Sequence, residues 1–119
     1  MSRVDLVGDL EVKQGATYQL DLYYVTSAGT AIDLSGYTAR MTLRADFEAT
    51  TALLSLTSSP AAGLVVTGAS GLVTVTITNT QTAALTAGPF VYDLEIVSAG
   101  GVVTRMAEGV GVISREVTR

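Results

Sequence analysis

The stretch Phe90-Val-Tyr-Asp-Leu-Glu-Ile-Val97 decides the fold class, because apolar and acidic side chains alternate along it. Residues two apart in a β-strand lie on the same face of the sheet. Phe90, Tyr92, Leu94 and Ile96 therefore share a face that is expected to point into a core, while Asp93 and Glu95 share the opposite face. The stretch predicts a strand with one buried and one exposed face.

Three other stretches show the same alternation, namely Tyr18–Tyr24, Tyr37–Arg44 and Leu72–Thr78. Glycine inside a strand often marks a bulge or a close backbone approach, which applies to Gly109 and Gly111. Short strands that each have one apolar face, seven or eight in all, predict an antiparallel sandwich or a small barrel. The weaker strand patterns cover Leu10–Lys13, Leu53–Thr57, Leu64–Thr67 and Val102–Ile113.

The segments between the strands carry turn and capping signals. Asp33-Leu-Ser-Gly36 predicts an Asx-type turn that leads into a strand. Asn79–Gly88 predicts at most one short helical stretch, with Asn79 and Thr80 as capping candidates and Gly88 as the stop. Leu85 is expected to close the end of the core beside this helix.

The chain has the size of one domain, because 119 residues leave no room for two ordinary ones. No linker or composition break divides residues 1–119. We expect the ends, residues 1–8 and 114–119, to form extended arms that can reach a neighbour. The charged start predicts a product made in the cytoplasm without a signal peptide.

Composition excludes several classes of partner. The net charge is −4, only 15% of residues are charged, and 48% are hydrophobic. The seven basic residues are scattered along the chain and form no stripe that could neutralise phosphates, so we expect neither nucleic acid nor anionic membrane as a partner. The low charge is instead consistent with a surface partly covered by other proteins.

Catalytic chemistry is also disfavoured. The chain has no cysteine and no histidine, which removes thiolate chemistry, the most versatile general base and the commonest metal ligand. Asp93 and Glu95 could act as an acid–base pair or bind calcium, but a solvated strand face is the better interpretation. Asp5, Asp9 and Glu11 lack the spacing of a calcium loop. We therefore predict no catalytic residue, no cofactor and no metal site.

Interface residues are sought among tyrosine and charged side chains. Tyr23 lies out of phase with the apolar positions, beside Asp21 on a polar face, and is a candidate interface anchor. The other tyrosines of these strands fall on the apolar phase and are predicted to be core. The candidate interface residues are Tyr23, Asp21, Arg40, Arg44, Arg115 and Arg119.

Five stretches of the chain resemble a phage family. They are Lys13–Leu20, Ala31–Met41, Thr80–Leu85, Gly88–Ile96 and Gly109–Arg119. Together they are similar to small tail-region proteins of bacteriophages and prophages, in particular to the N-terminal domain of phage baseplate upper proteins. The resemblance implies an immunoglobulin-like β-sandwich that is built into a virion. Baseplate upper proteins continue into a longer C-terminal region, whereas this sequence stops at Arg119, which favours a stand-alone adaptor or a surface decoration.

The function expected from this resemblance is structural. The chain would dock fibre or receptor-binding parts onto the tail or baseplate, with other virion proteins as partners and with several copies in a symmetric assembly. After synthesis in the cytoplasm of the host bacterium it would reside in the virion. A capsid decoration protein and a carbohydrate- or cell-surface-binding module are the alternatives, and an enzyme is the least favoured class.

Overall fold

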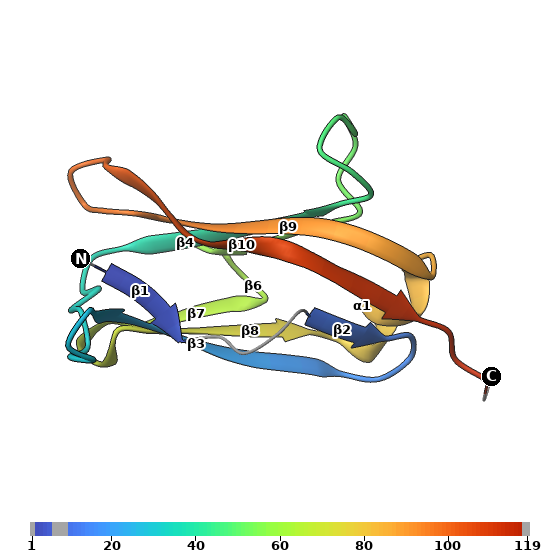
Figure 1. The fold of residues 1–119 in the computed structure, drawn as a ribbon, viewed down its shortest axis with the longest axis horizontal. Coiled ribbons are helices and arrows are strands. Elements are labelled where there is room, and N and C mark those ends of the chain that lie inside the picture. The colour runs from blue at the N-terminus through green and yellow to red at the C-terminus, as the bar shows by residue number, and fades with distance from the viewer. Residues whose placement is uncertain (1, 6–9, 118–119) are drawn as a thin grey trace.

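Two β-sheets face each other and enclose the core (Figure 1). The computed structural model describes residues 2–5 and 10–117. Sheet A curls like half of a barrel, and its strands, in spatial order, are β1 (Ser2–Asp5), β3 (Tyr18–Thr26), β8 (Leu72–Ile77) and β7 (Leu64–Thr67). Sheet B contains, in order, β2 (Leu10–Lys13), β10 (Val103–Ser114), β9 (Gly88–Val97), β4 (Thr38–Arg44), β5 (Leu54–Ser58) and β6 (Ala61–Ala62).

The predicted all-β sandwich is confirmed, and its connectivity is immunoglobulin-like. Strands β1, β3, β8 and β7 form one sheet, and β4, β9 and β10 form the centre of the other, as in that fold. The ladders are antiparallel except for β2, which pairs in parallel with the end of β10. The chain therefore enters in sheet A and crosses to sheet B between β1 and β2.

All eight predicted strands are present, with boundaries that move by a residue or two, and two short strands are added. Ser2–Asp5 was expected to lie in an N-terminal arm but instead pairs with β3 as β1. Ala61–Ala62 forms β6, which meets β5 through a single residue pair, Ser58 with Ala61. At the other end, the Glu116 backbone N–H donates to the Gln14 Oε1 atom at 3.1 Å, which ties part of the expected C-terminal arm to the domain.

The predicted helix is α1 (Asn79–Ala84), but its N-cap is Thr78 rather than Asn79 or Thr80. The Gln81 backbone N–H donates to Thr78 Oγ1 at 3.2 Å, and the Thr78 N–H donates back to Gln81 Oε1 at 3.0 Å. This reciprocal capping box satisfies two amide groups that a helix start leaves unpaired. A 3₁₀ turn, η1 (Gly68–Ser70), is an addition to the single helical stretch expected.

Helix α1 closes one end of the core, as predicted for the segment with Leu85, which is 6% exposed. The buried Thr82 hydroxyl lies 2.9 Å from the carbonyl oxygen of Ala16 and fixes the helix to the turn between β2 and β3. Among the residues described, no helix is long and apolar enough to cross a bilayer.

A close approach of two strands occurs at Gly111 in β10. A Cβ atom at this position would lie 2.7 Å from the Leu10 carbonyl oxygen and 2.8 Å from Phe90 Cε1, so only glycine fits between them. The close approach expected from the glycines of this strand is therefore confirmed. The bulge lies elsewhere, between Arg105 and Ala107, where Met106 is the extra residue and turns into the core.

The Asx-type turn predicted at Asp33 is also confirmed. The Ser35 backbone N–H and the Ser35 hydroxyl both donate to Asp33 Oδ1, at 2.9 and 2.6 Å. These two hydrogen bonds favour the charged carboxylate and hold the pKa of Asp33 below its usual range. The turn directs the fully buried Leu34 into the core ahead of β4.

We predict that Gly111→Ala destabilises the domain by about 2 kcal/mol, because the added methyl group overlaps the Phe90 ring and the Leu10 carbonyl. Urea denaturation monitored by far-UV circular dichroism measures the loss. Gly100→Ala is the matched control, since the nearest atom to its Cβ outside the adjacent residues would be Ser98 Oγ at 3.9 Å. Equal stability of the two variants would contradict the close approach.

We also predict that the carboxyl group of Asp33 titrates below the usual aspartate range in an NMR pH titration, and that Ser35→Ala raises its pKa. Because the folded pKa is lower than the unfolded one, the turn stabilises the fold above the unfolded pKa and loses this effect as the pH falls through the folded pKa. Ser55→Ala, at an exposed position on β5, serves as the control and should leave the Asp33 titration unchanged.

Candidate interaction face

The side of sheet B that points away from the core carries most of the ordered charged side chains. We call it the outer face of sheet B. It is formed by alternate residues of four adjacent strands, whose register places them in rows across the sheet. Its members are Glu11 and Lys13 on β2; Val103, Arg105, Glu108, Val110 and Val112 on β10; Pro89, Val91, Asp93, Glu95 and Val97 on β9; and Thr38, Arg40, Thr42 and Arg44 on β4.

Ion pairs run across the strands of this face. Arg40 Nε lies 2.8 Å from Glu95 Oε1 and links β4 to β9. Arg105 bridges β9 and β10, with Nε 3.8 Å from Asp93 Oδ2 and Nη1 3.4 Å from Glu108 Oε2. The side chains of these pairs are 24–63% exposed, so the pairs add little to stability but hold the charges in a fixed order.

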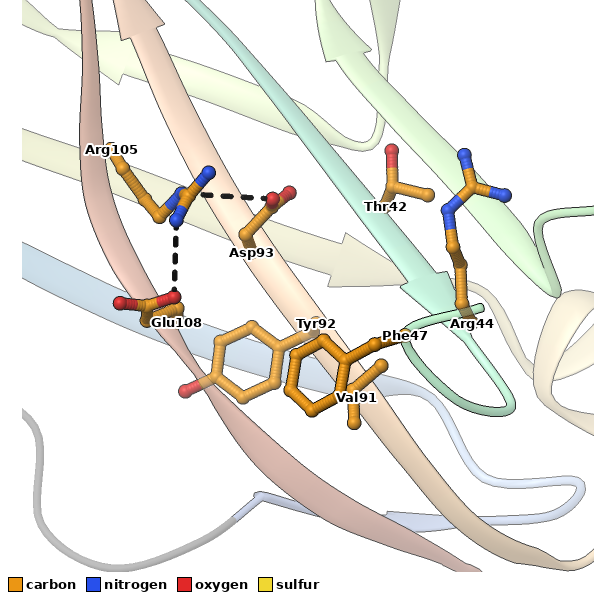
Figure 2. A pocket seen from close by; sticks show the side chains of 8 residues that line it. All are labelled: Thr42, Arg44, Phe47, Val91, Tyr92, Asp93, Arg105 and Glu108. Carbon is orange, nitrogen blue, oxygen red and sulfur yellow. Dashed lines mark hydrogen bonds and ion pairs between the residues drawn. The ribbon is translucent and has the colours of Figure 1, made fainter. Parts of the chain in front are cut away.

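A shallow hollow lies beside these ion pairs (Figure 2). Its volume is about 190 Å³, which is below the size of typical small-molecule pockets and closer to that of one side chain. Phe47, 80% exposed, stands at its rim on the loop after β4, and Arg44 Nη1 donates to the Ala49 carbonyl of that loop at 3.3 Å. The lining residues are Thr42, Arg44, Phe47, Val91, Tyr92, Asp93, Arg105 and Glu108.

The neighbouring part of the face is apolar. Val110 and Val112 are 48% and 43% exposed, and their register partners on β9 are Val91 and Pro89. With Phe47 they form a continuous apolar area next to the ion pairs. Clustered exposed apolar side chains of this kind mark interaction sites more often than single ones do.

The structure describes five of the six predicted interface residues, and these five lie on different surfaces. Arg40 and Arg44 lie on the outer face of sheet B, whereas Asp21 and Tyr23 lie on β3 of sheet A. Tyr23 is exposed as expected, at 43%. Arg115 is exposed just after β10, where it lines a separate hollow with Gln14 and Leu85.

Arg119 lies outside the described residues. The candidates therefore do not form one site, and the interface role of each stays a prediction.

Sequence reasoning missed the apolar part of this face. The signal is the repeat Gly109-Val-Gly-Val112, in which the glycines point inward and the valines outward. Phe47 gave no periodic signal because it lies in a loop.

The remaining tyrosines behave as predicted. Tyr92 is buried, and Tyr18, Tyr24 and Tyr37 are partly buried against the core. Burial raises the pKa of Tyr18, and the neighbouring Tyr92 raises it further.

The carboxylates of β9 lie on the outer face, and both Asp93 and Glu95 have an arginine partner. This placement agrees with their interpretation as the polar face of a half-buried strand. Within residues 10–117, whose side chains are described, no group of three or more acidic residues is arranged to hold a metal ion. Of the second acidic cluster, the Asp5 and Asp9 side chains lie outside that range.

Comparison with models of protein families finds no match, and comparison with curated protein sequences finds no similar protein. A functional assignment therefore depends on the residues and on the surfaces that they form.

We predict a coupling of about 0.2–1 kcal/mol between Arg40 and Glu95 in a double-mutant cycle with alanine, because their side chains are 53% and 24% exposed. Urea denaturation of the wild type, both single variants and the double variant gives this value. A cycle between Arg40 and Glu108, which form no ion pair with each other in the structure, is the control and should give a coupling near zero. A coupling well above 1 kcal/mol for Arg40 and Glu95 would contradict the assignment of an exposed pair.

Proposed function

We propose that this chain is a non-enzymatic structural protein of a bacteriophage virion, an adaptor that docks fibre or receptor-binding parts onto the tail or baseplate. The observation that carries the proposal is the outer face of sheet B, where exposed valines and Phe47 adjoin ordered ion pairs. Apolar side chains combined with ordered polar groups are typical of protein–protein interfaces.

The form of this surface favours a protein partner over a small ligand. The hollow on it has a volume of about 190 Å³, and Phe47, which lines it, is itself 80% exposed. Protein partners instead bury broad, nearly flat areas, and the rows of side chains on a four-strand surface supply such an area. A rigid sheet also positions these side chains without the entropy cost of ordering a loop.

The phage assignment draws on the resemblance in the sequence. The stretches that carry it form the turn between β2 and β3, the turn before β4, helix α1, strand β9 and the end of β10. The turns and the helix belong to the framework, whereas β9 and β10 also carry residues of the outer face of sheet B. They support a shared architecture with phage tail proteins, and the exposed face supports an assembly role within that architecture.

One observation favours a second candidate, a carbohydrate- or cell-surface-binding module. Tyr23 is 43% exposed on the outer side of β3, next to the exposed Asp21 on the same side. An aromatic ring beside a carboxylate can bind a sugar through stacking and hydrogen bonds. Binding of the purified chain to a glycan array that is lost in Tyr23→Ala would favour this module over the adaptor.

The proposal predicts that an antibody raised against the purified chain labels the tail or baseplate of phage particles made by the strain that encodes it. Immunogold electron microscopy provides the measurement, and antibody pre-absorbed with the purified chain is the control. Gold on the head would favour the capsid decoration protein. Particles that contain no copy of the chain, by labelling and by mass spectrometry, would contradict a virion role.

A further inference from the structure

The outer face of sheet B differs in charge from the rest of the molecule. Among the described side chains, it carries four basic and four acidic groups and is therefore neutral, whereas the whole chain has a net charge of −4. The basic members are Lys13, Arg40, Arg44 and Arg105, and the acidic members are Glu11, Asp93, Glu95 and Glu108. The net negative charge lies on the remaining surface, so two copies of this chain repel each other least when they approach through this face.

The register of β9 and β10 makes the face complementary to itself. The two strands are antiparallel, and their outer residues pair as Val91 with Val110, Pro89 with Val112, and Glu95 with Arg105. Consider a two-fold axis that lies just above the outer face, parallel to these strands and over the line midway between them. Rotation about this axis places β10 of the second copy opposite β9, and β9 of the second copy opposite β10. Each residue of β9 then faces a β10 residue of the second copy. This is the same residue with which it pairs in the sheet of its own chain.

This symmetry brings matching chemistry together. Val91 lies opposite Val110 of the second copy, so the apolar areas coincide. Glu95 lies opposite Arg105 of the second copy, so one row of charges is attractive. Glu108 lies opposite Asp93 of the second copy, and Arg105, which contacts both carboxylates in its own chain, offsets this repulsion.

We propose that the outer face of sheet B pairs with the same face of a second copy of this chain about this two-fold axis, so that the adaptor is a dimer. The inference rests on the proposed function and deepens it: the protein partner that the outer face of sheet B takes first is a second copy, and the dimer is the unit that would dock virion parts through its remaining surfaces. The outer side of sheet A, with the exposed Tyr23 and Asp21, is one such surface.

The size of the face suits this pairing. The strands β2, β10, β9 and β4 have 4, 12, 10 and 7 residues, and at a rise of about 3.3 Å per residue and a spacing of about 4.8 Å they cover roughly 500 Å². Stable interfaces bury about 800 Å² per partner, and accessible area exceeds projected area because side chains stand above the sheet. Phe47 on the neighbouring loop enlarges the contact further.

The test is the concentration dependence of the mass of the purified chain in sedimentation equilibrium, from about 1 µM to 1 mM. We expect the mass to rise from the 12.3 kDa of one chain to twice that value. Val110→Lys should weaken the dimer at least about tenfold, because the lysine is desolvated between the two copies, opposite the apolar Val91 of the second copy. The substitution lowers the net negative charge, so general charge repulsion cannot explain dissociation.

Val65→Lys is the matched control. Val65 is an exposed valine, at 58%, on β7 of sheet A, and its substitution should leave the dimer intact. Circular dichroism establishes that each variant is folded, and Val112→Lys replaces Val110→Lys if the latter fails to fold.

A wild-type chain that stays monomeric over the whole range would overturn the dimer, as would a dimer that Val110→Lys does not weaken or that Val65→Lys weakens equally. Each of these results leaves the immunogold test of the virion role unaffected, so the two proposals fail separately.

Discussion

The packing of the Phe90 ring against the backbone of Gly111 is the contact on which the rest of the structure depends. It lies where β9, β10 and β2 meet, since Gly111 pairs with Phe90 on one side and with Leu10 on the other. A side chain at Gly111 would push these strands apart. The contact therefore fixes the register of the antiparallel ladder and also places the parallel strand β2, through which the chain crosses from one sheet to the other. Phe90 itself, 1% exposed, then lies at the centre of the inner face.

The same contact determines what the opposite face presents. Because the positions of Gly109 and Gly111 face inward beneath Tyr92 and Phe90, the residue that follows each of them must point outward, and these residues are Val110 and Val112. The bulge at Met106 shifts the phase of β10 by one residue. It turns Met106 into the core and brings Arg105 and Glu108 to the same face, where both contact each other. One strand with two glycines and one bulge thus completes the core and also builds the mixed apolar and charged surface.

Periodicity was enough to predict the sheet elements, because each long strand has one buried face and its side chains alternate accordingly. It could not predict β1 or β6, since Ser2-Arg-Val-Asp5 contains a single apolar residue and Ala61–Ala62 has only two positions, so neither shows an alternating apolar face. The N-cap of helix α1 is Thr78, one residue before the expected Asn79. Thr78 takes this position because it forms a reciprocal capping box with Gln81, three residues later. The arrangement of side chains on the outer face of sheet B was harder to predict from the sequence. The pairing of Arg40 with Glu95 joins residues 55 positions apart and depends on the register of β4 with β9, which alternation alone does not specify.

The composition of the outer face is better explained by recognition than by stability. Exposed ion pairs contribute little free energy of folding, and exposed valines contribute less than buried ones. The stability of the fold alone therefore gives no reason for ion pairs and exposed valines to lie together on one surface. Charges of alternating sign do, however, fix the register of an approaching surface and exclude wrong partners, while the apolar area supplies the affinity. In a chain with a net charge of −4, a neutral area is also the place where an equally acidic copy can approach without repulsion. A second copy of the chain that covers the outer face of sheet B in the assembled state thus explains both the ordered ion pairs and the exposed valines.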